Sequence, residues 1–442
     1  MKKLLTSLII SSIFISNSFA ADKNFVVNPN TMRGQLFSKN MSLLQALNNV
    51  QNSKLNVSMA RAKLLPTLNL GVLLPALGNP TFLLSSVTFL FPFLVPSNWA
   101  VLKQQKDLFE SDKASYKALQ LNILSNALSL YYIYMNDQKV KNVYADQSDL
   151  LTRLYTILKK QSDVLGNVTS EDLNMSQAQM EEAKIRVSKL TELLVEEKAG
   201  LRSLLGLPLG TEVIVEDADL LPSEYEGKSV GEIADHSMDV APEFAQMAFL
   251  VKASEAGKFA KMFGFMSNAS LSGTATNGNS PFDNLKAGGA FSFGADNLVN
   301  IKIANNNLAS ILLRADQLKL ENEKSAEIVV GKMTEVKEQQ VLSALALSSH
   351  VKVFEGQRRQ FNLGLISLQA LLQTESQLTD SKISNLKIDM DLKMQRLTLQ
   401  RLVIDGDFSK VKGCTATIQP ENKSIFHRKD KEQSLDQLCQ AE

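Results

Sequence analysis

The two stretches that decide the fold are LGNVTSEDL at residues 165–173 and LGLISLQAL at residues 363–371. Aligned on their glycines, Gly166 and Gly364, both have a hydroxyl residue three positions later and a leucine seven positions later. A glycine readily takes the left-handed backbone that ends an incoming helix, and a Ser or Thr side chain caps an outgoing one. Each stretch therefore predicts a turn between two helices.

The segments next to these turns have the composition of very long helices. No proline occurs between Pro96 and Pro208, or between Pro281 and Pro420. A proline inside a helix removes a hydrogen bond and clashes with the preceding turn, so such gaps permit long helices. The helix predicted over about 98–165 would be roughly 100 Å long. That length suits a rod or tunnel across an aqueous space better than a compact globule.

Apolar residues along this segment recur every three or four positions, as in helices packed along a coiled-coil seam. The stripe comprises Leu121, Leu124, Leu128, Tyr131 and Met135. We assign it to core packing and not to a cofactor site. A shorter partner helix, about 170–205, carries a similar stripe interrupted by Glu197.

A stretch unlike helix precedes each long helix, at residues 67–95 and 268–298. Both are rich in Gly, Ser, Thr, Asn, aromatic and β-branched residues. Each can hold two strands of about 9 to 11 residues, the length that crosses an outer membrane when tilted. A further helix is expected before each strand pair, at about 42–63 and 230–262. The predicted fold class is mainly α with a small β part, organised as two tandem repeats of long coiled-coil helical hairpins.

The predicted organisation follows from these segments. It comprises a signal peptide (1–20), an N-terminal segment (21–41), repeat 1 (42–206, tip at 165–170), an acidic linker (207–229), repeat 2 (230–406, tip at 363–367) and a polar C-terminal tail (407–442).

The first twenty residues have the pattern of a secretory signal. Lys2 and Lys3 precede an apolar run over residues 4–15, and the run is followed by Ser18 and Ala20 at the positions that signal peptidase inspects. The run is shorter than the roughly 20 residues of a membrane-spanning helix. An exported chain with no other long apolar run is expected in the periplasm, outside the cell, or in the outer membrane.

Charge and cysteine content restrict the partners. Removal of Lys2 and Lys3 changes the formal net charge from +1 to −1, which argues against a nucleic-acid surface. Cys414 and Cys439 are the two cysteines of the chain. In an oxidising compartment they are expected to form a disulfide, with two free thiols as the alternative. Together with His427 they make no recognisable metal-ligand pattern.

In combination, several short motifs resemble the TolC-like outer-membrane efflux protein family, along nearly the whole mature chain. Besides the two tip stretches, they are LLPTLNL at 64–70, QAQ at 177–179, ESQ at 375–377 and LLGLP at 204–208. The resemblance implies a homotrimer in which each chain gives four strands to a shared twelve-stranded outer-membrane barrel. It also implies a periplasmic α-helical tunnel that serves drug efflux or type I secretion.

The resemblance further implies that the chain itself performs no chemistry, holds no cofactor and lies among outer-membrane lipids. An inner-membrane transporter and a periplasmic adaptor would supply energy and substrate. In the family the grooves around the helical tips meet the adaptor. This places the contact at Gly166, Thr169, Gly364 and Ser367.

The residues expected to close the periplasmic end of the channel depart from the family pattern. Many members close that end with acidic residues six and nine positions after the second tip glycine, where this chain has Ala370 and Gln373. Asp172 keeps an acid at the corresponding position of the first repeat. A periplasmic constriction formed by copies of Asp172 is therefore a hypothesis.

Two other function classes were weighed. An enzyme is disfavoured because no catalytic constellation stands out and the histidines are scattered along the chain. A periplasmic coiled-coil scaffold or adaptor without a functional barrel is the main alternative. It rests on residues 82–95, which are apolar on both faces where a barrel strand should alternate.

Overall fold

The computed structural model describes residues 24–65, 87–90, 92–166, 168–264, 266–273, 285–291 and 294–411. The signal peptide predicted at 1–20, most of the strand region 67–95, and Cys414 and Cys439 lie outside these residues.

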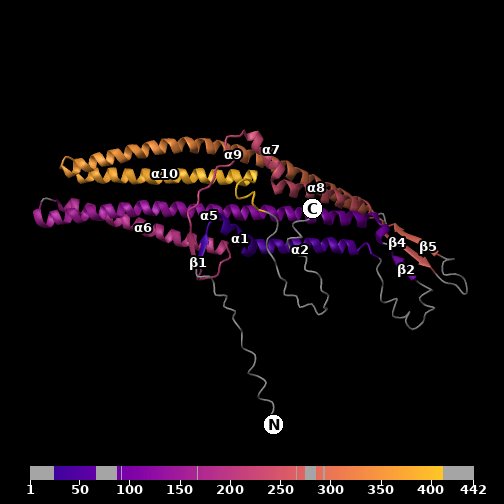
Figure 1. The fold of residues 1–442 in the computed structure, drawn as a ribbon. Helices are drawn as coiled ribbons and strands as arrows, with labels where there is room; N and C mark the ends of the chain where they lie inside the picture. The colour runs from indigo at the N-terminus through magenta and orange to yellow at the C-terminus, as the bar shows by residue number, and fades with distance from the viewer. Residues whose placement is uncertain are drawn as a thin grey trace, which may run out of the picture.

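The described residues form mainly long antiparallel helices with a few short strands (Figure 1). The first half contains β1 (Asn24–Val27), α1 (Pro29–Lys39), α2 (Met41–Ala62), β2 (Val87–Leu90), the 3-10 turn η1 (Pro92–Leu94), α5 (Pro96–Leu165) and α6 (Ser170–Leu204). The second half contains β3 (Glu212–Val215), α7 (Val230–Val240), α8 (Pro242–Met262), β4 (Met266–Gly273), β5 (Leu285–Phe291), α9 (Ala295–Asn362) and α10 (Leu368–Val403). None of the described helices combines the length and apolar character needed to cross a bilayer.

Each long helix runs beside two shorter ones. The 70-residue α5 extends over roughly 105 Å, with α6 along one half and α2 along the other (Figure 1). The 68-residue α9 is arranged in the same way with α10 and α8. The pairs α5–α6 and α9–α10 are the two helical hairpins, and α5 also contacts α8 and α10 of the second half.

The helix predicted over 230–262 is broken in the structure. α7 ends at Val240, and α8 begins at Pro242. Ala241 between them is extended, with φ −73° and ψ 128°, because a residue before proline is driven away from the helical region. Proline at the first helical position then starts α8 without losing a hydrogen bond.

The strands at one end of the long helices form an antiparallel sheet in the order β2-β4-β5. β2 from the first half pairs with β4 of the second, with Val87 opposite Gly273. The strand region predicted over 268–298 corresponds to β4 and β5, but its last residues already belong to α9. α9 begins at Ala295, directly after the extended N-cap residue Gly294.

A second sheet joins the predicted N-terminal segment (21–41) to the predicted acidic linker (207–229). β1 in the N-terminal segment pairs in parallel with β3 in the predicted acidic linker, with Phe25 opposite Val213. The predicted polar tail also begins inside the core, since Phe408 and Val411 are buried. β1 and β3 have four residues each, too few to show the alternation that marks a strand in a sequence.

The largest core lies where these segments meet the middle of α5. It includes Met32 from α1, Leu121 and Tyr131 from α5, and Phe408. The Tyr131 hydroxyl donates a hydrogen bond to the Glu216 carbonyl oxygen, 2.5 Å away. The core therefore joins the middle of α5 to the C-terminal ends of α6 and α10, and the hairpin tips project away from it (Figure 1).

Candidate functional site: the paired helical tips

The first tip is a tight turn built by its glycine and its threonine. Gly166 ends α5 in the left-handed region (φ 61°), and its N–H donates to the Ser162 carbonyl. Thr169 is the N-cap of α6, and its Oγ1 accepts from the Asp172 N–H at 3.0 Å. A Cβ at position 166 would meet no neighbouring atom. Glycine is therefore favoured here by the positive φ angle and not by lack of space for a side chain.

The second tip closes with a Schellman motif. Gly364 has φ 73°, its N–H donates to the Phe361 carbonyl, and the Leu365 N–H reaches back to the Gln360 carbonyl at 2.9 Å. Ser367 caps α10, because its Oγ accepts from the Ala370 N–H at 3.3 Å. The cap roles predicted from sequence for the glycine and hydroxyl residues thus occur in both turns.

Both tips lie at the same end of the molecule, opposite the β2-β4-β5 sheet (Figure 1). A shared apolar cluster holds them together. Leu151 and Leu158 of α5 pack with Met180 of α6 and with Leu368 and Leu372 of α10. The four predicted contact residues are therefore brought to one end by hairpins that touch each other.

Large apolar side chains are exposed at these turns. Val164, Leu363 and Leu365 are 79%, 73% and 70% exposed. Leu363 and Leu365 flank the second tip glycine. The sequence predicts the contact at the four turn residues and their neighbours, but it does not show which of those neighbours are exposed. Their exposure makes them candidates for burial against another protein.

A buried polar link joins the two hairpins above the tips. Gln147 of α5 donates through Nε2 to Glu375 Oε2 of α10 at 2.9 Å. Thr379 donates through Oγ1 to the other oxygen, Oε1, also at 2.9 Å. Glu375 is only 6% exposed, and burial raises the pKa of its carboxyl despite these hydrogen bonds and the nearby charges of Lys382 and Arg186. In the sequence, Glu375 stands out only as the first residue of the ESQ motif at 375–377.

Asp172 has a local partner in the structure. Its Oδ2 accepts a hydrogen bond from Thr169 Oγ1 at 2.8 Å, while its own N–H donates to the same hydroxyl. The carboxylate therefore contributes to the cap at the positive end of the α6 dipole. At the corresponding place in the second turn, Ala370 contributes only its N–H.

The described tip residues are turn-forming, capping and exposed apolar side chains. Across the described ranges, no group of three or more His, Cys, Asp and Glu residues is placed to hold a metal ion. His236 stacks on Tyr225 with ring centroids 4.6 Å apart, and His350 lies between the hairpin helices in a shallow polar groove with Asp380. His427 lies outside the described residues. The tips thus offer apolar side chains and helix ends to a partner.

Known proteins match this chain in fold but not in sequence. No protein-family model matches the chain, and no curated protein matches it. Solved structures do match. The outer-membrane channel OprN superposes with a TM-score of 0.71 at 15% identity, covering 86% of this chain and 90% of that one.

Two further channels superpose over a similar extent. The CmeC outer-membrane channel of Campylobacter jejuni gives a TM-score of 0.70 at 13% identity, with 86% of this chain and 88% of that chain covered. The outer-membrane protein VceC of Vibrio cholerae gives 0.68 at 12% identity, with 86% and 96% covered. The chain therefore has the TolC-like fold of outer-membrane channels, as the sequence resemblance predicted.

Proposed function

We propose that this chain is an outer-membrane channel subunit that gives passive exit to substrates delivered by an inner-membrane pump and a periplasmic adaptor. One observation carries the proposal. Two paired hairpin tips and an antiparallel sheet lie at opposite ends of helices roughly 100 Å long. A molecule of this shape can seat its sheet in the outer membrane and extend its tips across the periplasm.

The sheet supports a shared barrel. β4 has eight residues and β5 has seven, and they pair antiparallel to each other. A tilted strand crosses the apolar band of an outer-membrane barrel with about 9 to 11 residues, so each strand would need a few more residues to cross it. An open three-stranded sheet cannot lie in lipid with its edge groups unpaired, so three chains with four strands each would close a barrel of twelve. The strand pair predicted over 67–95 stays a prediction, because most of these residues lie outside the described ones.

An exposed face of α9 supports the homotrimer. Leu313, Leu320 and Leu345 are among its large apolar side chains that lie open in the single chain. They recur along more than thirty residues of helix, so they suit a long helix–helix interface with a second copy. A closed ring of three chains would cover this face in each protomer.

The tips would meet the adaptor. Gly166, Thr169, Gly364 and Ser367 shape the two turns, and the exposed Val164, Leu363 and Leu365 supply the apolar contact. The role of Asp172 in a constriction stays a prediction. Single-channel conductance of Asp172→Ala, compared with that of the unmodified chain with and without divalent cations, tests it. No difference between the two proteins would reject that role.

Fractionation tests the main proposal. We expect the mature chain in the outer-membrane fraction, soluble only in detergent, as a trimer whose band on a gel shifts after heating. Planar bilayers that contain the purified trimer should show discrete conductance steps. A monomer released with the soluble periplasm would reject the channel and favour the coiled-coil scaffold.

A further inference from the structure

Four helix ends come together beside the β2-β4-β5 sheet. They are the end of α2, the start of α5, the end of α8 and the start of α9 (Figure 1). Val57 and Ala60 of α2 pack on Leu102 of α5. A Cβ on Gly257 of α8 would lie 2.8 Å from Gln104 Nε2 of α5. These ends therefore form one continuous rim under the sheet.

The rim carries an excess of positive charge. Over residues 55–65, 93–107, 255–264 and 294–303, the chain has seven cationic and three acidic side chains. We name the seven cations the cationic collar: Arg61, Lys63, Lys103, Lys106, Lys258, Lys261 and Lys302. All but the partly buried Lys258 are exposed, and within the described part of the chain none of the seven forms an ion pair.

The opposite end of the hairpins does not share this bias. Residues 159–173 and 352–361 contain five cationic and four acidic side chains. The excess at the sheet end is thus a property of that end and not of the long helices in general. A single-sign surface attracts a partner of opposite charge.

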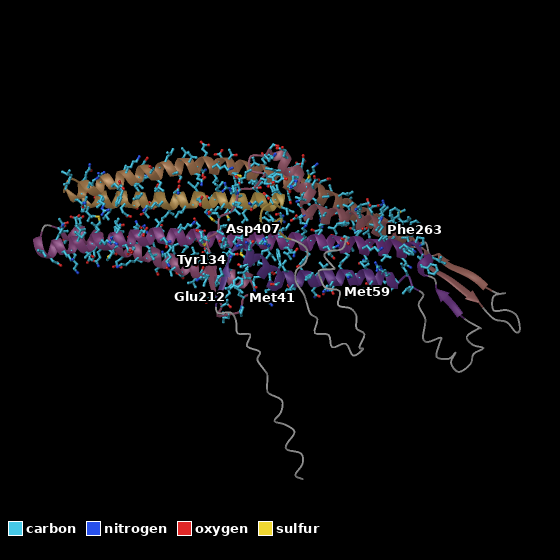
Figure 2. The ribbon with its side chains drawn as sticks, in the orientation of Figure 1. Met41, Met59, Tyr134, Glu212, Phe263 and Asp407 are labelled. Atoms are coloured by element: carbon cyan, nitrogen blue, oxygen red, sulfur yellow. The ribbon has the colours of Figure 1, made fainter. Side chains whose placement is uncertain are left out.

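Exposed aromatic and apolar side chains lie among the collar cations. Trp99 is 53% exposed, and its Nε1 donates to the Phe93 carbonyl at 2.7 Å. Phe259 and Phe263 are exposed at the end of α8, and Figure 2 shows Phe263 where the helices give way to β4. Aromatic rings of this kind concentrate at the boundary between lipid and water, where long cationic side chains extend to the head groups.

We propose that the cationic collar binds the phosphate head groups of anionic phospholipids in the membrane leaflet that surrounds the base of the sheet. The proposal rests on the proposed function, which puts the sheet in the outer membrane. A phospholipid leaflet fits both features of the rim, because its head groups pair with the cations and its acyl boundary accepts the aromatic rings. A soluble anion would use only the first feature.

The only tryptophan of the chain, Trp99, gives a direct assay. The detergent-purified full chain is reconstituted in lipid discs with brominated phosphatidylglycerol or brominated phosphatidylcholine, which quench tryptophan on contact. We expect Trp99 to be quenched by both lipids, and the anionic lipid to be preferred at least tenfold. The preference should fall as salt shortens the Debye length from about 10 Å at 0.1 M to about 3 Å at 1 M.

A charge variant tests the collar itself. Lys103→Gln, Lys106→Gln, Lys261→Gln and Lys302→Gln together should abolish the preference, because each cation near an anionic surface contributes roughly a fivefold effect at low salt. The matched control changes four exposed lysines on α5 and α9 away from the rim: Lys159→Gln, Lys160→Gln, Lys332→Gln and Lys352→Gln. The control should keep the preference.

The outcomes separate the two proposals. Equal quenching by the two lipids in the unmodified chain, or an equal loss in the control variant, overturns the collar and leaves the channel intact. Loss of the preference on adding inorganic phosphate at matched ionic strength also overturns it, because the site would then be one for a soluble anion. Absence of quenching by either lipid contradicts the membrane location and so the proposed function.

Discussion

The two long helices, α5 and α9, are nearly equal in length but differ in what covers them. α5 contacts α2, α6, α8 and α10, while α9 is covered mainly by its hairpin partner α10 and by α7 and α8. As a result, α5 supplies Leu124, Leu128 and Tyr131 to the central core. Leu313, Leu320 and Leu345 of α9 stay exposed.

The difference shows which helix is packed within the single chain and which keeps an uncovered apolar face. A helix that is apolar on an uncovered face is unstable in water by itself, since its stability comes from packing that face. α5 finds that packing within the chain. α9 finds only part of it among the described residues, and its uncovered stripe is the one that we propose to pack against a second copy.

The largest effect expected is a contrast between leucines of the two helices. Leu124→Ala in α5 removes a fully buried side chain and should lower the free energy of unfolding by about 3 kcal/mol. Leu345→Ala in α9 should change the free energy of unfolding of the dissociated chain by less than about 0.5 kcal/mol. The same substitution should make the trimer dissociate more easily. Urea unfolding in dilute detergent and heating on gels measure the two quantities. Equal effects of both substitutions on the dissociated chain would break the comparison.

The next effect concerns the link between the hairpins. Glu375→Ala leaves the buried Gln147 amide without its partner, so we expect a loss of about 1–3 kcal/mol. Glu375→Gln keeps a group of the same shape that can hydrogen-bond and should cost less. Asp380→Ala, at an exposed acid of the same helix, is the control and should cost below about 0.5 kcal/mol. Unfolding by urea at constant pH measures all three, and a similar cost for both acids would remove Glu375 as a link.

The third prediction concerns a buried acid between the helices of the first hairpin. Burial and then the neighbouring Asp137 raise the pKa of Glu197, on α6, to about 7. Between α9 and α10 of the second hairpin, the Gln340 amide donates to Asp389 and the Ser343 hydroxyl donates to Asn385. Protonated Glu197 is favoured by folding, so the stability it contributes is complete below its unfolded pKa of 4.5 and is lost as the pH rises to about 7.

We expect the free energy of unfolding to fall by about 1–2 kcal/mol over that window, a value reduced for partial hydration. Glu197→Gln should flatten the profile, while Gln340→Ala in the second hairpin should shift it without changing its shape. Urea midpoints collected from pH 4 to pH 8 provide the measurement. A profile that keeps its slope in Glu197→Gln would assign the titration to another group. Glu375, whose pKa is also raised, is the first alternative.

The smallest effect should be found at the tips. Thr169→Ala and Ser367→Ala each remove an N-cap, at about 1 kcal/mol. The Thr169 change should be the larger, because this hydroxyl both accepts from the Asp172 N–H and donates to its carboxylate. Hydrogen exchange of the first turns of α6 and α10 should show the difference. Equal protection in the two variants would mean that the carboxylate adds nothing to the cap.

Much of the helical framework could be predicted from the sequence, since it depends on local signals. The proline gaps gave the lengths of the long helices, and Gly166 with Thr169 gave the first turn. The features that the sequence did not predict depend on contacts between residues far apart in the chain. β1 and β3 are too short to show alternation, and their pairing becomes visible only when Phe25 is found opposite Val213.

The candidate site could be predicted to a similar degree, and the features that the sequence did not predict also depend on the folded structure. Backbone demands mark Gly364 and Ser367, but exposure of Leu363 is a property of the folded surface. Burial of Glu375 needed knowledge of which helix lies against α10. The stripe of α9 could not be separated from that of α5, because a sequence does not say whether its partner belongs to the same chain.

The parallel pairing of β1 with β3 has a consequence for the order in which the chain can fold. β1 lies at the start of the described chain, and its partner is more than 180 residues later. Phe408 joins the same core later still. Closing such long loops is slow, because their entropy is lost before the contacts are gained. During folding, therefore, β1 can pair only after residues more than 180 positions later have been made. The segments between them must remain unaggregated until then.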